Sequence, residues 1–69
     1  MVEVFKTNVQ QRKLAEHLAS ILRGRFPSSK INFDLSDCDK ILRVEDKEIC
    51  VETVIEILST RGLECEVLT

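Results

Sequence analysis

Tryptophan and tyrosine are absent from this sequence of 69 residues, and phenylalanine occurs only three times. Domains that read RNA on a sheet surface need stacked aromatic side chains in a basic surround. The net charge is instead −2 and the isoelectric point is near 5.3, whereas nucleic-acid binders usually carry a basic patch. We therefore expect no nucleic-acid partner.

Long apolar runs are also missing. No segment approaches the roughly 20 apolar residues that are needed to span a bilayer. The first residues, Met1–Val4, have neither the basic region nor the apolar region of a secretion signal. These absences predict a cytoplasmic protein with no membrane partner.

The three cysteines, Cys38, Cys50 and Cys65, form no CxxC pair, and the single histidine, His17, has no second metal ligand one turn away. An odd number of widely spaced cysteines argues against a disulfide framework and fits reduced thiols. No nucleophile–base pair and no glycine-rich phosphate loop occurs either. We therefore expect no cofactor and no enzymatic activity.

What is present is a regular alternation of short strands and amphipathic helices within one domain, residues 1–69. Apolar residues recur at every second position in the strand segments and at helical spacing in the two longer segments. The predicted order is a strand at Val2–Lys6, a helix from about Val9 to Arg23 or Arg25, strands at Lys30–Ser36 and Ile41–Glu45, a helix from about Cys50 to Arg61, and a strand at Leu63–Val67.

The alternation also assigns faces. In the first strand we place Val2 and Val4 inward and Phe5 on the open face of the sheet, where Ile41 and Arg43 of a later strand also lie. In the first helix the apolar stripe is predicted to consist of Leu14, Leu18, Ile21 and Leu22, with Arg12, Glu16, Ala19, Ser20 and Arg23 on the opposite side.

Strands with one apolar face favour an antiparallel sheet that is covered by helices on one side only. We expect an α+β fold, a ferredoxin-like βαββαβ two-layer sandwich with the sheet order 4-1-3-2. This topology brings three connections to one end of the molecule: Thr7–Gln11, Ser36–Lys40 and Gly62–Leu63. Cys38 is therefore predicted to lie near the first strand–helix turn.

That turn is predicted to cap its own helix. Asn8 followed three residues later by Gln11 has the pattern of a capping box, and Thr7 with Gln10 offers a second register.

The chain resembles the heavy-metal-associated domains of copper chaperones and metal-pumping ATPases, as a divergent member. The resemblance rests on Val2–Thr7, Leu14–Leu22, Ile41–Glu45 and the stretch from Val54 to Leu58 followed by Arg61-Gly62-Leu63. The working motif of that family reads Met-Thr-Cys-x-x-Cys. The equivalent positions here are Thr7, Asn8 and Gln11, so the threonine is kept and both cysteines are missing.

Thiolates hold soft Cu(I) far better than amide oxygens do, so the resemblance implies the scaffold without its metal. We expect a domain with a protein-interaction or regulatory role, with a protein partner or weak self-association. The possible interaction surface comprises Phe5, Ile41 and Arg43 on the open face, together with the edge strand Lys30–Ser36.

Two alternatives stay open. Cys38 between Asp37 and Asp39 offers one thiolate and two carboxylates, a ligand set suited to Zn²⁺ more than to Cu(I), for a divergent metal-binding or metallochaperone-like protein. Cys50 lies at the start of the second helix, where a helix N-terminus lowers thiol pKa values.

Overall fold

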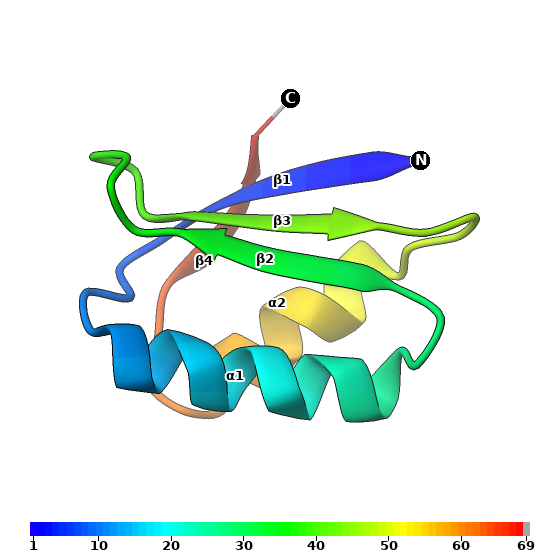
Figure 1. Cartoon of the computed structure of the whole chain (residues 1–69), viewed down its shortest axis with the longest axis horizontal. Coiled ribbons are helices and arrows are strands. Elements are labelled where there is room, and N and C mark those ends of the chain that lie inside the picture. Colours follow the sequence, from blue (N-terminus) through cyan, green and yellow to red (C-terminus); the bar gives the residue numbers. More distant parts are fainter. Residues whose placement is uncertain (69) are drawn as a thin grey trace.

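The computed structural model describes residues 1–68 as one two-layer domain (Figure 1). In chain order the elements are β1 (Val2–Thr7), α1 (Arg12–Arg25), β2 (Lys30–Asp34), β3 (Ile41–Glu45), α2 (Val51–Ser59) and β4 (Cys65–Leu68). The strands form one antiparallel sheet in the order β2-β3-β1-β4. This is the predicted order counted from the other edge.

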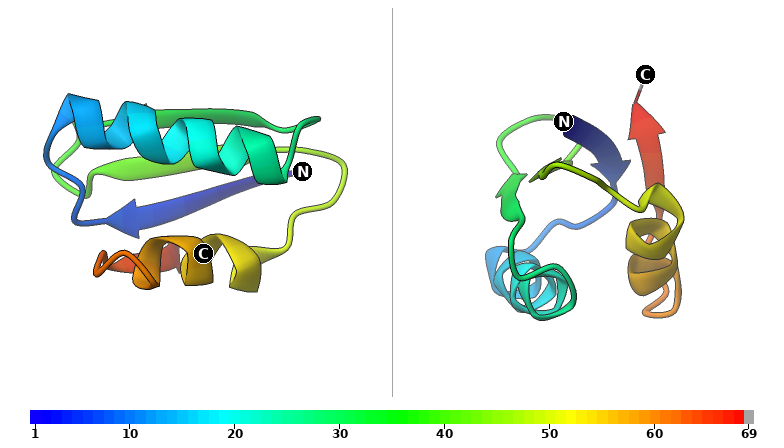
Figure 2. Two further views of the ribbon diagram at one scale, coloured as in Figure 1. Left: turned by 90° about the horizontal axis from the view of Figure 1, so that it is seen from below. Right: turned by 90° about the vertical axis from the view of Figure 1, so that its right-hand side faces the viewer.

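Both helices pack on the same face of the sheet, as the end view in Figure 2 shows. The core lies between the two layers and joins β1, β2 and β3 to the helices. One row of the inner face runs across three strands, because Leu42 is paired with Phe33 on one side and with Phe5 on the other. Leu22 of α1 and Leu58 of α2 close this core from the helical layer, and both are fully buried. The predicted α+β ferredoxin-like fold is confirmed.

The predicted faces of β1 are wrong. Phe5 is fully buried, whereas Val2 is 42% exposed. This strand has apolar residues at both even and odd positions, so alternation alone does not decide which face is inward. Phenylalanine buries about 150–250 Å² of surface, much more than valine, and its burial decides the orientation of the strand.

The predicted start of the first helix is also wrong, because α1 begins at Arg12 rather than at Val9. Val9 is fully buried and packs with Ala15 and Leu18 in a second apolar cluster. An extended segment brings Val9 into this cluster before the helix begins. Ala19, which we placed on the outer side of the helix, is buried as well.

The second helix, α2, ends at Ser59, two residues before the predicted end at Arg61, but Gly62 closes it as the sequence predicts. Gly62 adopts a φ of 75°, and the N–H of Leu63 donates to the carbonyl of Leu58 at 3.1 Å. A glycine in this left-handed conformation just after a helix satisfies carbonyl groups that the last turn leaves open.

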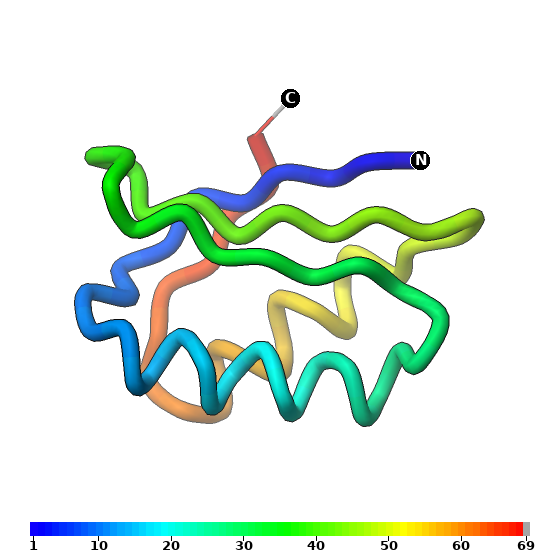
Figure 3. The backbone as a smooth tube through the Cα atoms, viewed as in Figure 1, coloured from blue at the N-terminus to red at the C-terminus, as the bar shows by residue number. Residues whose placement is uncertain are grey.

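The three connections expected at one end do lie together, as Figure 3 shows for the turn after β1, the β2–β3 loop and the segment between α2 and β4. Within residues 1–68, no helix has the length and apolar character to cross a membrane.

Candidate functional site

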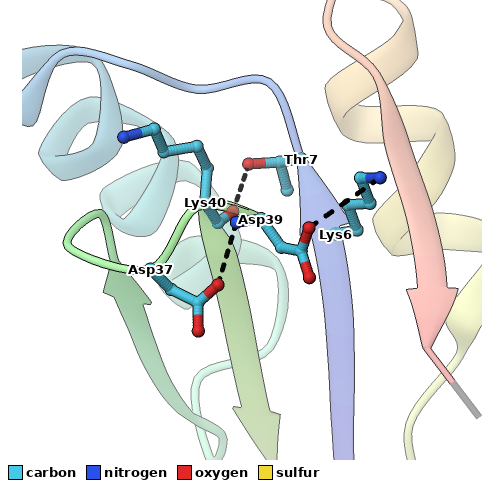
Figure 4. Close-up of polar contacts among 5 residues, drawn as sticks. All are labelled: Lys6, Thr7, Asp37, Asp39 and Lys40. Atoms are coloured by element: carbon cyan, nitrogen blue, oxygen red, sulfur yellow. Dashed lines mark hydrogen bonds and ion pairs between the residues drawn. The ribbon is translucent and has the colours of Figure 1, made fainter.

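Thr7 joins the end of β1 to the β2–β3 loop. Its hydroxyl is buried, donates to the carbonyl of Lys40 at 2.5 Å and accepts from the N–H of Val9 at 3.2 Å. Its own N–H donates to the carbonyl of Asp39 at 3.1 Å. Figure 4 shows the hydroxyl contact from β1 to the loop. The threonine that the family resemblance singled out is therefore a structural link between segments.

Asn8 and Gln11 do not form the predicted capping box. The side-chain oxygen of Asn8 accepts from the N–H of Glu64 at 2.9 Å, which ties the turn to the segment before β4. Gln11 occupies the N-cap position with an extended backbone, and its side chain makes no capping hydrogen bond within residues 1–68. The late start of α1 explains this difference, since the burial of Val9 keeps residues 8–11 out of the helix.

The β2–β3 loop is held in shape by its own polar groups. The carboxylate of Asp37 accepts from the N–H of Asp39 at 2.8 Å, and the carbonyl of Asp37 accepts from the N–H of Lys40 at 3.0 Å. Lys40 has a φ of 47°, a conformation that costs a residue other than glycine roughly 1–2 kcal/mol. The ammonium of Lys40 donates to the carbonyl of Leu35 at 3.0 Å, so several hydrogen bonds offset this cost.

Asp37, Cys38 and Asp39 bring one ligand atom each to within 4.8 Å of one another. Asp37 and Cys38 are exposed and Asp39 is half-buried. One carboxylate oxygen of Asp39 lies 3.8 Å from the ammonium of Lys6 (Figure 4). The loop lies beside the turn after β1, as predicted, and its aspartates already serve the loop and an ion pair with β1.

The open face of the sheet differs from the prediction. Phe5 belongs to the core and is removed from this surface, while Ile41 is half-buried and Arg43 is exposed. Val4 stands beside Arg43 on one side and Leu68 on the other in the strand register. The sequence interpretation placed Phe5 on the open face and Val4 in the core, because it assigned the side chains of β1 to the wrong faces of the sheet.

A groove that the sequence did not reveal runs between α1 and the edge strand β2. It has a volume of about 150 Å³ and is lined by Arg12, Ala15, Glu16, Ala19, Arg23, Ile31, Asn32, Phe33 and Leu35. The guanidinium of Arg23 donates to the carbonyl of Ile31 at 3.0 Å. The small side chains at positions 15 and 19 were the available signal, since alanines on one helix face allow a close approach to the sheet.

The thiols differ in their surroundings. Cys50 is exposed at the N-cap of α2, with its sulfur 2.9 Å from the hydroxyl of Thr53. Hydrogen bonds from Thr53 lower the pKa of Cys50, although the charge of Glu52 opposes this effect. Burial raises the pKa of the Cys65 thiol to about 11.

With this geometry established, the chain can be compared with known proteins. No protein-family model matches the sequence, and no curated protein is similar to it in sequence. Among solved structures, the fold is similar to the yeast copper transporter domain Ccc2a, determined in solution in the apo and Cu(I)-loaded states. The TM-score is 0.80 with 18% identity, over 99% of this chain and 94% of that chain. The chain therefore has the fold of the heavy-metal-associated domains, as the resemblance implied.

The link through Thr7 can be tested by removing its hydroxyl at constant shape. Thr7→Val leaves the carbonyl of Lys40 and the N–H of Val9 without their partner, so we expect a loss of about 1–3 kcal/mol in the free energy of unfolding. Thr7→Ser keeps the hydroxyl and loses a methyl group worth about 0.8 kcal/mol. Urea unfolding of the three proteins measures both effects. A Val variant as stable as the parent would show that the hydroxyl contributes nothing.

The alkylation rates of Cys50 and Cys65 should differ in a series of pH values. Since the pKa of Cys50 is lowered and that of Cys65 is raised to about 11, iodoacetamide should modify Cys50 before Cys65 at pH values near 8, because the thiolate is the reactive form. The rate at Cys50 should level off at a lower pH than that of a free cysteine peptide. Mass spectrometry of the digested protein gives the rate at each thiol. In urea the rates should converge, and equal rates in the folded protein would contradict the assignment.

Proposed function

We propose that the protein is a non-catalytic protein-interaction domain, built on the heavy-metal-associated scaffold without its metal site. The observation that carries the proposal is the state of the turn after β1. The chain has amides at positions 8 and 11, and the oxygen of Asn8 accepts a backbone hydrogen bond from Glu64. Amides are poor ligands for soft Cu(I), and this one is already used in holding the fold together.

The contact surface in this proposal is the exposed side of β2 with the groove next to it. An edge strand offers unpaired N–H and C=O groups to a second chain, and β2 is one outer strand of the sheet. Ile31 accepts from Arg23 and therefore directs its carbonyl away from β3. The groove adds apolar wall from α1 and charged side chains at its rim, features that recur where an extended segment joins a sheet.

We place the protein in the cytoplasm as part of this proposal. All three cysteines are free in the structure, and free thiols are usual in a reducing compartment.

Photocrosslinking in the parent cells tests the surface. A photoreactive amino acid at Asn32, which is exposed on β2, should yield a discrete adduct of higher mass that mass spectrometry identifies. The same amino acid at Glu56, which is exposed on α2, serves as the control and should yield none. The absence of any adduct from position 32, or equal adducts from both positions, would overturn the proposed surface.

A second candidate function is the binding of Zn²⁺ by the β2–β3 loop. It is favoured by the group of Asp37, Cys38 and Asp39, whose ligand atoms lie within 4.8 Å of one another. Zinc bonds of about 2.0–2.3 Å require neighbouring ligand atoms to be roughly 3.3–3.8 Å apart, so the loop would have to close slightly. The contacts of Asp37 with the N–H of Asp39 and of Asp39 with Lys6 oppose that closure.

Metal titration distinguishes the two candidates. Under the interaction proposal, adding Zn²⁺ or Cu(I) produces no saturable NMR shift at the amides of Cys38 and Thr7. The double variant Asn8→Cys/Gln11→Cys restores two thiolates at the family's spacing and should bind one equivalent of Cu(I), because soft ions prefer sulfur. Saturable Zn²⁺ shifts at Cys38 in the parent, lost in Cys38→Ser, would establish the second candidate in place of the first.

A further inference from the structure

The outer side of β2 has a defined set of peptide groups available for pairing. In an antiparallel ladder, successive residues alternate between those bonded to the neighbouring strand and those facing away. The bond from Arg23 to the carbonyl of Ile31 marks Ile31 as a residue that faces away from β3. By the same alternation the peptide groups of Phe33 also face away from β3. The peptide groups of Lys30, Asn32 and Asp34 bond to β3.

From this arrangement we infer that the partner at the β2 edge is a second copy of this chain, with β2 paired antiparallel to β2 about a two-fold axis through Asn32. The inference rests on the proposed function, which supplies the surface. In this register Ile31 of each copy lies opposite Phe33 of the other, and the two residues exchange both backbone hydrogen bonds. A carbonyl oxygen has two lone pairs, so that of Ile31 can keep Arg23 and accept from the other copy.

The charges of β2 select this register. The strand reads Lys30-Ile31-Asn32-Phe33-Asp34, with opposite charges at its two ends. Rotation about Asn32 places Lys30 opposite Asp34 of the other copy, twice, on the open face. A register shifted by one residue would set side chains of the open face opposite side chains of the core face. A register shifted by two residues would keep the faces but would no longer place Lys30 opposite Asp34. A parallel arrangement in register would set like charges side by side.

The carboxylate at the C-terminal end of the strand, that of Asp34, stays ionised near neutral pH. Hydrogen bonds from Ser36 hold the pKa of Asp34 below its usual range, with the Ser36 hydroxyl 2.6 Å from the carboxylate. Opposite charges directly across a strand pair stabilise it, and like charges destabilise it.

The α1 helices of the two copies also bring opposite charges together. Glu16 and Arg23 both line the groove and lie about two turns apart on α1. Ala19 lies between them and lines the groove together with Asn32. Rotation about the axis through Asn32 sets the two α1 helices antiparallel, so Glu16 of one copy comes toward Arg23 of the other. The alanines in this face leave room for the approach.

The strand has five residues, so the pairing buries little surface. Interfaces below about 1,200 Å² are typical of weak or transient complexes. We therefore expect association that depends on concentration over the range from about 10 µM to about 1 mM, rather than a permanent dimer.

A charge-reversal set tests the register. Lys30→Asp places two aspartates opposite each other at both ends of the pairing, and Asp34→Lys places two lysines there. Each variant alone should dimerise more weakly, on the order of tenfold in dissociation constant. An equimolar mixture of the two variants restores opposite charges at every position and should associate to within about threefold of the parent. Analytical ultracentrifugation measures each constant.

Controls separate the register from net charge. Lys13→Asp on α1 and Glu56→Lys on α2 change the total charge by the same amounts at exposed positions outside the groove, and should leave the constant unchanged. Circular dichroism checks the fold of each variant. In the parent, amide exchange at Ile31 and Phe33 should slow as concentration rises, while that at Asn32 should not change.

Two results would overturn the inference: a parent protein that stays monomeric up to about 1 mM, or single variants and their mixture that associate equally well. Photocrosslinking keeps this failure apart from that of the proposed function. An adduct from position 32 to a different protein, with a monomeric parent, leaves the interaction surface standing and removes only the second copy. No adduct of any kind from that position removes the surface itself.

Discussion

The buried hydroxyl of Thr7 is the interaction on which one end of the domain depends, the end that holds the turn after β1 and the β2–β3 loop. It bonds to the carbonyl of Lys40 and to the N–H of Val9, so one side chain fixes the β2–β3 loop against β1 and sets the path of the chain into α1. The first contact brings Asp39 beside Lys6, and the second directs Val9 into the core. Since both partners are backbone groups in largely buried surroundings, leaving either without a bond would cost more than the bond itself contributes.

The amide at position 8 has a role that a metal-bound thiolate could not have. A cysteine in a Cu(I) site directs its sulfur at the ion, whereas the oxygen of Asn8 accepts from the N–H of Glu64. This contact joins the turn after β1 to the segment before β4, at the same end of the sheet where Thr7 holds the β2–β3 loop (Figure 3). Side-chain-to-backbone bonds thus connect the three segments at this end. The scaffold is held here by its own polar groups.

The fold could be predicted because element order, short connections and one-sided apolar strands leave few topologies. The local errors arise where two burial choices competed. In β1, Val2 and Val4 favoured one face and Phe5 the other, and the larger aromatic surface prevailed. Before α1, the capping pattern of Asn8 and Gln11 favoured an early helix, and the burial of Val9 prevailed. Local propensity is weak beside burial of a whole apolar side chain, worth roughly 1.5–3 kcal/mol.

The candidate site was less accessible to sequence reasoning, because its parts follow from how two elements meet. Periodicity assigned Arg12, Glu16 and Arg23 to the outer side of the first helix, which was correct for exposure but silent about what lay beside them. The groove exists because α1 lies next to an edge strand, and there the exposed Arg23 donates to the carbonyl of Ile31, which faces away from β3. A sheet that does not close into a barrel has two edge strands, whose outer N–H and C=O groups are available unless other groups cover them. The side chains that border an edge therefore decide whether it repels, admits or selects another strand.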